Sequence, residues 1–98
     1  MHATYLRMIK KIPMGGERCW SVYMLRCGDG SLYTGITKDV ERRLLSHQSG
    51  RGAAYTKTHS PVALVYREKG FTRSQALIRE AEIKRYSKPK KEKLINLC

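Results

Sequence analysis

The sequence predicts one small α+β domain, a three-stranded antiparallel sheet flanked by helices. Three features support this class: two short runs of β-branched and aromatic residues, one continuous apolar run, and two segments with helix-capping signals. With 98 residues, 41% of them hydrophobic, the chain has room for one hydrophobic core. We expect the domain to span residues 20–98 and residues 1–19, which lack clean periodicity, to form a flexible arm.

The first two strands are predicted to form a β-hairpin. Residues 20–26 and 31–37 are the two runs, and Gly28-Asp29-Gly30 separates them. Such a short loop with glycine at both ends is typical of hairpins, and Gly30 can adopt the positive φ that the turn requires.

The length of the hairpin loop decides which side chains share a face of the sheet. If all three residues form the loop, Leu25 faces Tyr33 and Tyr23 faces Gly35, so both phenols lie on one face. A two-residue loop would place the tyrosines on opposite faces. In the first register, the glycine opposite Tyr23 leaves open space that suits a substrate.

A helix is predicted over residues 38–49. Thr37 or Asp39 can serve as its N-cap. On it, Val40 and Leu44 form an i,i+4 pair that points inward.

Arg43 and His47 form a second i,i+4 pair on the neighbouring face of that helix. Two phenols, from Tyr23 and Tyr33, can therefore meet a guanidinium and an imidazole. Taken alone, the tyrosines would indicate ordinary packing of an amphipathic strand.

The segment 50–60 is predicted to be a loop. It interleaves an aromatic side chain, Tyr55, with the charges of Arg51 and Lys57, a pattern suited to phosphates and an unstacked base. A solvated connector explains the loop equally well, and we expect His59 to be merely exposed.

The apolar run 62–66 predicts a buried central strand, the third strand of the sheet. A second helix is then expected over residues 72–86, because Thr72 and Gln75 have the spacing of a capping box. Pro89 favours the first turn of a short C-terminal helix. Three residues are expected to anchor that last helix: Leu94, Ile95 and Leu97.

Glu80 is the outlier of the second helix, because it lies within an apolar stripe formed by Ala76, Leu77 and Ile83. A buried carboxylate costs several kcal/mol unless it is paired or bound to metal. The residues alone allow a salt bridge with Arg43 or Lys84, or a ligand for one divalent cation.

The charge balance indicates a polyanionic partner. The chain carries 20 Lys and Arg against 8 Asp and Glu, a formal charge of +12. The densest positive patch is near the C-terminus, where the candidate nucleic-acid contacts are Lys84, Arg85, Lys88, Lys90 and Lys91. No apolar run approaches membrane length, and the three cysteines suggest neither a disulfide framework nor a zinc site, so a cytoplasmic location is expected.

The ordered motifs resemble the GIY-YIG nuclease superfamily over roughly residues 20–90. Ser21-Val22-Tyr23 and Tyr33-Thr34-Gly35 look like its two half-motifs, followed by Arg43 and then Glu80 at the position of its metal-binding glutamate. The short length and the basic C-terminal helix further resemble the small stand-alone bacterial members.

The resemblance implies a divalent-metal-dependent endonuclease that hydrolyses DNA, with a role in repair or recombination and with branched or damaged DNA as candidate substrates. It places Tyr23, Tyr33, Arg43, His47 and Glu80 at the site, with Glu80 binding one Mg²⁺ or Mn²⁺ ion. The resemblance leaves open which of the two phenols accepts a proton from the attacking water. We favour Tyr23 as this base, with Tyr33 orienting the water. A protein partner could supply targeting. The alternative is a non-catalytic nucleic-acid-binding module with the same fold.

Overall fold

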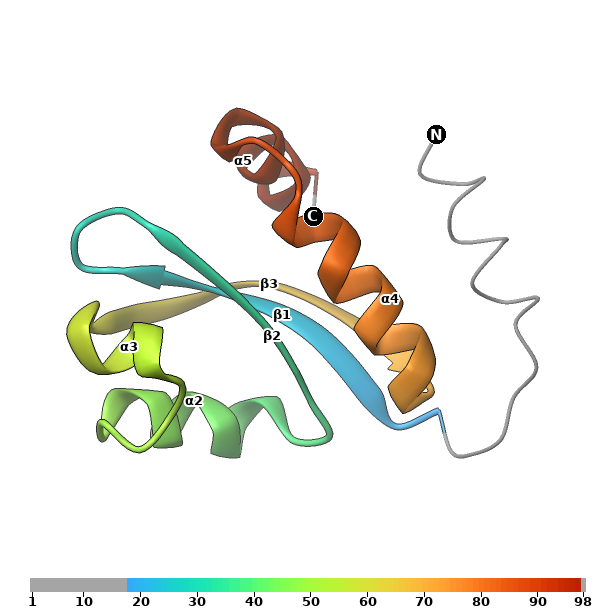
Figure 1. Ribbon diagram of the computed structural model, residues 1–98, viewed down its shortest axis with the longest axis horizontal. Helices are drawn as coiled ribbons and strands as arrows, with labels where there is room; N and C mark the ends of the chain where they lie inside the picture. Colours follow the sequence, from blue (N-terminus) through green and yellow to red (C-terminus); the bar gives the residue numbers. More distant parts are fainter. Residues whose placement is uncertain (1–17, 98) are drawn as a thin grey trace.

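The computed structural model describes residues 18–97, except for the side chain of Val62. The predicted arm therefore lies almost entirely outside the described residues. The elements occur in this order: β1 (Trp20–Cys27), β2 (Leu32–Thr37), α2 (Val40–Gln48), α3 (Ala54–Thr58), β3 (Pro61–Phe71), α4 (Arg73–Lys84) and α5 (Lys88–Asn96) (Figure 1). The α+β class with one three-stranded antiparallel sheet is confirmed.

The predicted hairpin register is the one observed. Tyr23 pairs with Gly35 and Leu25 pairs with Tyr33. Gly30 adopts a φ of 85°, a conformation that a residue with a side chain rarely takes. The three-residue loop therefore places both tyrosines on the same face of the sheet.

The prediction that residues 62–66 form the central strand is wrong. The strand order is β2-β1-β3, so β1 lies in the centre and β3 is an edge strand. β3 also continues to Phe71 through polar residues, with Arg67 and Lys69 exposed. Its apolar run reflects contact with helices on both faces of the sheet, and this contact does not require a strand neighbour on both sides.

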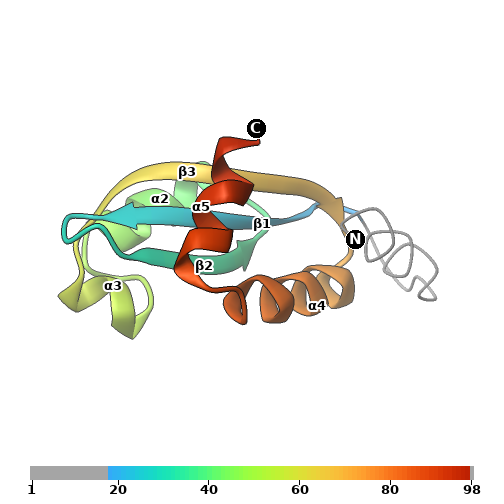
Figure 2. The ribbon, with the colours of Figure 1, turned by 90° about the horizontal axis from the view of Figure 1, so that it is seen from above.

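Helices cover both faces of the sheet (Figures 1 and 2). On one face, Val22 and Met24 of β1 belong to a core cluster with residues of α4 and α5. On the other face, Tyr23 and Leu25 pack with Val40 of α2. Because alternate residues of a strand point to opposite faces, β1 contributes to both clusters.

Capping follows the sequence closely. Asp39 accepts a hydrogen bond from the backbone N–H of Arg42 as the N-cap of α2. Thr72 and Gln75 form a reciprocal capping box at the start of α4. Pro89 lies in the first turn of α5, as predicted.

The apolar stripe of α4 differs from the prediction. Ala76 and Ile83 are fully buried, but Leu77 is 40% exposed and Arg79 is completely buried in its place. Leu97, a predicted anchor of α5, is also exposed. The register of α4 turns the Arg79 position toward β3, where Glu68 offers a charge partner.

Arg79 is the centre of a buried polar network between α4 and β3. Its guanidinium donates two hydrogen bonds to Glu68, at 2.9 and 2.8 Å, and a third to the Tyr86 hydroxyl at 3.3 Å. Tyr66 donates to Glu68, and Tyr86 donates to Glu82. This paired geometry satisfies an arginine that could not otherwise be buried.

Candidate active site

Tyr23 and Tyr33 lie side by side on the face of the sheet that α2 covers. Their ring centroids are 6.2 Å apart, and Tyr23 is 1% exposed whereas Tyr33 is half-buried. Gly35 permits this approach, because a Cβ there would lie 2.7 Å from the Tyr23 hydroxyl and 3.0 Å from the Tyr33 ring. The space over Gly35 that was expected to suit a substrate is thus filled by the tyrosines themselves.

His47 projects from α2 into the same cluster and continues it by hydrogen bonds. The Tyr23 hydroxyl lies 2.7 Å from His47 Nε2, and His47 Nδ1 lies 2.7 Å from Thr56 Oγ1 on α3. Thr56 donates its single hydroxyl proton to the carbonyl of Ala53 at 2.9 Å. Thr56 Oγ1 must therefore accept a hydrogen bond from the protonated Nδ1, which leaves the unprotonated Nε2 to accept a hydrogen bond from the Tyr23 hydroxyl.

The loop before α3 closes over the imidazole. A Cβ at Gly52 would fall 2.1 Å from His47 Nδ1 and 2.9 Å from its Cα, so only glycine leaves room for the ring. Sequence reasoning missed Gly52, Ala53 and Thr56. The Gly-Ala-Ala run of small residues was a visible signal for close packing, but nothing in it pointed to His47.

Burial shifts the proton affinities of the linked pair in a consistent direction. It raises the pKa of Tyr23 well above its usual value near 10; the nearby Tyr33 phenol adds to this, and the Arg43 guanidinium partly offsets it. Burial first, and the charge of Arg43 second, lower the pKa of His47 below its usual value near 6.5. At neutral pH the pair is therefore a protonated phenol beside a neutral imidazole.

The lowered pKa of His47 predicts a loss of stability in mild acid. Histidine in the unfolded chain takes up a proton near pH 6.5, whereas His47 in the folded chain does so only at lower pH. Below about pH 6.5 the unfolded state thus binds more protons, so stability is full above that pH and decreases as the pH falls. Urea unfolding between pH 7.5 and 5, with an NMR titration of the His47 ring, checks this. A His47 titration midpoint above 6.5 would contradict it.

Arg43 adds a positive charge at the edge of this cluster. It is half-buried on α2, close enough to Tyr23 and His47 to affect the pKa of each. It also lines a small pocket with Thr37, Arg42 and Ser46. A phosphate group held by Arg43 would lie beside the Tyr23 phenol.

Glu80 stands apart from the other four predicted site residues. Its helix, α4, lies beside β2 and β1, but packs on the face opposite Tyr23. The Glu80 side chain is 18% exposed and pairs with Lys84 at 3.2 Å, one of the two salt bridges considered from the sequence. The structure therefore brings Tyr23, Tyr33, Arg43 and His47 together and places Glu80 apart from them, on α4.

A cation at Glu80 would need most of its ligands from elsewhere. Within residues 18–97, no group of three or more His, Cys, Asp or Glu side chains could hold a metal ion. Glu80 is a partly exposed carboxylate whose partner is a lysine that is itself half in solvent. Such a donor fits a hard cation that takes its remaining ligands from water and a substrate phosphate.

The other carboxylates of the described chain have structural partners. Glu68 pairs with Arg79, Glu92 with Arg26 and Glu41 with Arg67. Those that accept hydrogen bonds instead are Asp29 from Ser31, Asp39 from the Arg42 backbone, and Glu82 from Tyr86. Glu80 is thus the carboxylate that can be released by moving one exposed lysine.

The 50–60 segment contains the short helix α3, which carries an aromatic stack. Tyr55 stacks on Tyr33 with centroids 6.1 Å apart, and His59 stacks on Tyr55 at 4.0 Å with an interplanar angle of 8°. His59 is therefore not merely exposed, as expected, but forms the outer member of the stack. Arg51 and Lys57 are both exposed.

The predicted C-terminal patch is largely exposed but partly engaged within the protein. Lys84, Arg85, Lys88 and Lys90 are exposed and Lys91 is half-buried. Lys88 donates to the carbonyl of Gly30 at 2.8 Å, and the Lys90 ammonium lies 4.2 Å from the Tyr86 ring centroid.

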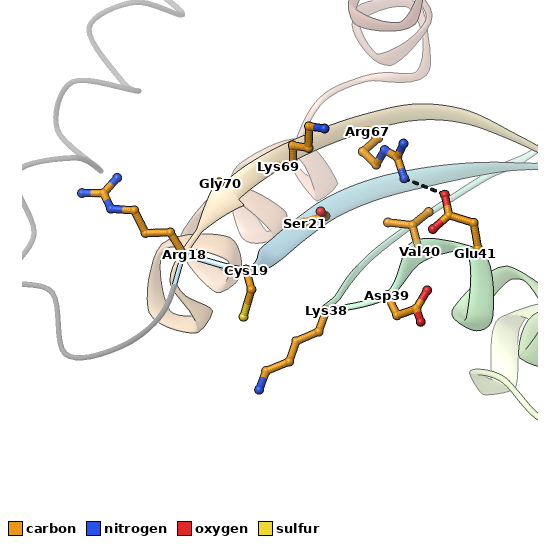
Figure 3. Close-up of a pocket in the computed structure, with 10 residues that line it drawn as sticks. All are labelled: Arg18, Cys19, Ser21, Lys38, Asp39, Val40, Glu41, Arg67, Lys69 and Gly70. Carbon is orange, nitrogen blue, oxygen red and sulfur yellow. Dashed lines mark hydrogen bonds and ion pairs between the residues drawn. The ribbon is translucent and has the colours of Figure 1, made fainter.

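A pocket elsewhere on the molecule includes none of the five predicted site residues. It lies where β1 and α2 begin, and its lining includes Arg18, Lys38, Glu41, Arg67 and Lys69 (Figure 3). Arg67 and Glu41 pair across it at 2.9 Å. The pocket borders the first described residues.

Comparison with known proteins identifies the family. Residues 19–93 match the model of the GIY-YIG catalytic domain. The chain belongs to the GIY-YIG family. A UPF0213 protein of Staphylococcus saprophyticus is 55% identical to this GIY-YIG chain over 75 residues, which cover 76% of it and 92% of the relative. A UPF0213 protein of Staphylococcus epidermidis is 54% identical over 74 residues, covering 76% and 90%.

A solved relative supports the fold of this GIY-YIG domain. The solution NMR structure of a UPF0213 protein from Bacillus halodurans matches with a TM-score of 0.52 and 45% identity, covering 80% of this chain and 83% of that one. The predicted resemblance to the small bacterial members of the family is thereby confirmed. Within the described residues, no helix of this GIY-YIG domain has the length and apolar character needed to cross a membrane.

Proposed function

We propose that this GIY-YIG domain is an endonuclease that hydrolyses DNA phosphodiester bonds with the help of a divalent cation. The observation that carries the proposal is the hydrogen-bond chain from Tyr23 through His47 to Thr56, next to Arg43. A buried phenol with a neutral imidazole as proton acceptor is an arrangement for moving a proton.

The pKa directions decide how the proton would move. Because burial disfavours the Tyr23 phenolate by raising the pKa of the phenol, Tyr23 is protonated at neutral pH before the reaction begins. When water attacks the phosphorus, it gives a proton to the Tyr23 oxygen while Tyr23 gives its own proton to His47 Nε2. Tyr23 ends the step neutral, and the imidazole ends it positively charged with Nδ1 still bound to Thr56.

Arg43 and Tyr33 would prepare the substrate for this step. The planar guanidinium of Arg43 can donate two hydrogen bonds to phosphate oxygens and balance the charge of the transition state. Tyr33, the more exposed phenol, lies beside Tyr23 and can orient the attacking water. Tyr55, stacked on its ring, restricts the Tyr33 rotamer.

Glu80 is the residue that we assign to the cation, Mg²⁺ or Mn²⁺. When bound, the cation would stabilise negative charge on the leaving oxygen. Its binding requires Glu80 to leave Lys84, and that lysine is then free to contact DNA. Affinity for the metal in the absence of nucleic acid should accordingly be weak.

A non-catalytic nucleic-acid-binding module remains the second candidate, because Glu80 lies outside the Tyr23 cluster and pairs with Lys84. For either candidate we propose a cytoplasmic role in DNA repair or recombination, with branched or damaged DNA as the substrate and a protein partner that supplies targeting.

Cleavage of labelled single-stranded, duplex, flap and branched DNAs with Mg²⁺ or Mn²⁺ separates the two candidates. We expect the wild type to cut at least one substrate and Arg43→Ala to cut none at a comparable rate. Salt-dependent binding by the wild type without cleavage under any condition would reject the enzyme in favour of the binding module.

A further inference from the structure

The solvent-facing side of α2 forms a basic groove that leads away from the candidate active site. One pocket is lined by Thr37, Asp39, Arg42, Arg43 and Ser46. A second is lined by Arg42, Leu45, Ser46 and Arg51. Because the two pockets share Arg42 and Ser46, they adjoin. We call the surface formed by Arg42, Arg43, Ser46 and Arg51 the α2 groove.

The carboxylates of the described residues near the α2 groove are engaged elsewhere. Asp39 is the carboxylate that lines it, and Asp39 is committed to the backbone N–H of Arg42 as the helix N-cap. Glu41, on the same helix, pairs with Arg67 of β3. Arg42 and Arg51 are both exposed. Within residues 18–97, therefore, no carboxylate pairs with the guanidinium groups of Arg42, Arg43 and Arg51.

We propose that the α2 groove is a track for the phosphates of the DNA strand next to the bond that is cut. This inference rests on the proposed function, because it starts from a scissile phosphate at Arg43. From there the groove continues past Arg42 to Arg51, so one strand can pass from the reacting phosphate to its neighbours without leaving a positive surface.

The size of the groove matches a few nucleotides. α2 (Val40–Gln48) has nine residues and is about 13 Å long at roughly 1.5 Å per residue; Arg42 and Arg43 lie near its start, and Arg51 follows its C-cap, Ser49. That length accommodates on the order of two to four phosphates of one strand. Arginine suits phosphate because its planar donors fit two oxygens at once, and the hydroxyl of Ser46 adds a neutral donor.

The α2 groove has a competitor in the C-terminal patch. There, however, Lys88 binds the Gly30 carbonyl, Lys90 lies over Tyr86 and, without a cation at Glu80, Lys84 pairs with Glu80. Binding DNA through those lysines would cost existing contacts. Among contacts within the described part of the chain, the Arg42 side chain would give up none, and Arg51 only a 3.3 Å hydrogen bond to Ser49.

Salt dependence of binding tests the track without requiring cleavage. Binding of a fluorescein-labelled single strand and a duplex of the same sequence is measured in EDTA across a range of salt concentrations. For Arg42→Gln/Arg51→Gln we expect the slope of log K against log salt to lose roughly 1.4–1.8, about 0.7–0.9 for each phosphate contact. Affinity should fall about equally for unrelated sequences.

Two control variants make the result specific. Arg73→Gln removes an exposed arginine from the start of α4 and should leave the slope unchanged. Arg85→Gln/Lys90→Gln removes two charges from the C-terminal patch and should reduce the slope less than the groove variant. The proposal of a phosphate track would be overturned if Arg42→Gln/Arg51→Gln kept the wild-type salt slope. It would also be overturned if Arg85→Gln/Lys90→Gln lost more of the slope than the groove variant.

The test separates failure of the track from failure of the enzyme. If the wild type cuts DNA but the groove variant keeps the wild-type slope, the track is wrong and the nuclease stands. If nothing is cut but the groove variant loses slope, the track stands as the surface of a binding module.

Discussion

Replacing Arg79 by methionine is expected to lower the free energy of unfolding by about 3–5 kcal/mol, a large part of the stability of a small domain. The substitution removes the hydrogen bonds to Glu68 and Tyr86 and leaves the Glu68 carboxylate, with 16% of its side chain exposed, without its charge partner. Urea unfolding monitored by circular dichroism measures the change. If the variant is only marginally stable, its free energy of unfolding can still be measured from the part of the transition at low urea concentration.

Two further variants show whether the cost comes from the orphaned charge. Arg73→Met, at an exposed position of the same helix, should change stability by no more than about 0.5 kcal/mol. Arg79→Met combined with Glu68→Met should recover much of the loss, because both members of a buried pair are then apolar. An Arg79→Met protein as stable as the wild type would refute the assigned role of this network.

Replacing Tyr23 by phenylalanine is expected to slow DNA cleavage by about 10²–10⁴-fold, the usual contribution of a general base. The ring still fills its place over Gly35, so the fold should remain intact. Because Tyr23 is almost completely buried, affinity for DNA should not change. Single-turnover cleavage together with binding in EDTA measures the two effects separately.

Tyr66→Phe is the matched control for the loss of a buried tyrosine hydroxyl. Tyr66 donates to Glu68 on the opposite face of the sheet, so its loss should affect stability and leave the rate of the chemical step unchanged. Cleavage by Tyr23→Phe at the wild-type rate would remove Tyr23 from the proposed mechanism.

The hairpin shows how much local sequence can predict. Gly28-Asp29-Gly30 sets the loop, and the loop sets the register that places Tyr23 opposite Gly35. The N-cap at Asp39 and the capping box at Thr72 are equally local, since each is satisfied by the backbone within three residues. The hairpin and the helix caps could be predicted because the residues that determine each of them lie within a few positions of one another in the sequence.

The features that the sequence did not predict depend on contacts between distant residues. Arg79 is buried because Glu68, eleven positions earlier, faces it from β3. The edge position of β3 depends on which strand β1 pairs with on each side, and a continuous apolar run does not encode this.

The candidate site divides in the same way. The i,i+4 spacing of Arg43 and His47 indicated a shared helix face, and the hairpin register brought Tyr23 and Tyr33 to one side. Thr56 and Gly52, which hold and enclose His47, come from a segment whose fold against α2 could not be inferred locally.

The most direct test of the nuclease proposal is metal-dependent cleavage by Glu80→Gln beside Glu82→Gln, with DNA binding of each measured in EDTA. Both variants remove one carboxylate from α4, but Glu82 is bound to Tyr86 whereas Glu80 holds only Lys84. We predict that Glu80→Gln binds DNA but loses at least about 100-fold in cleavage rate, and that Glu82→Gln keeps most of it. Equal cleavage by both variants would contradict the proposed site.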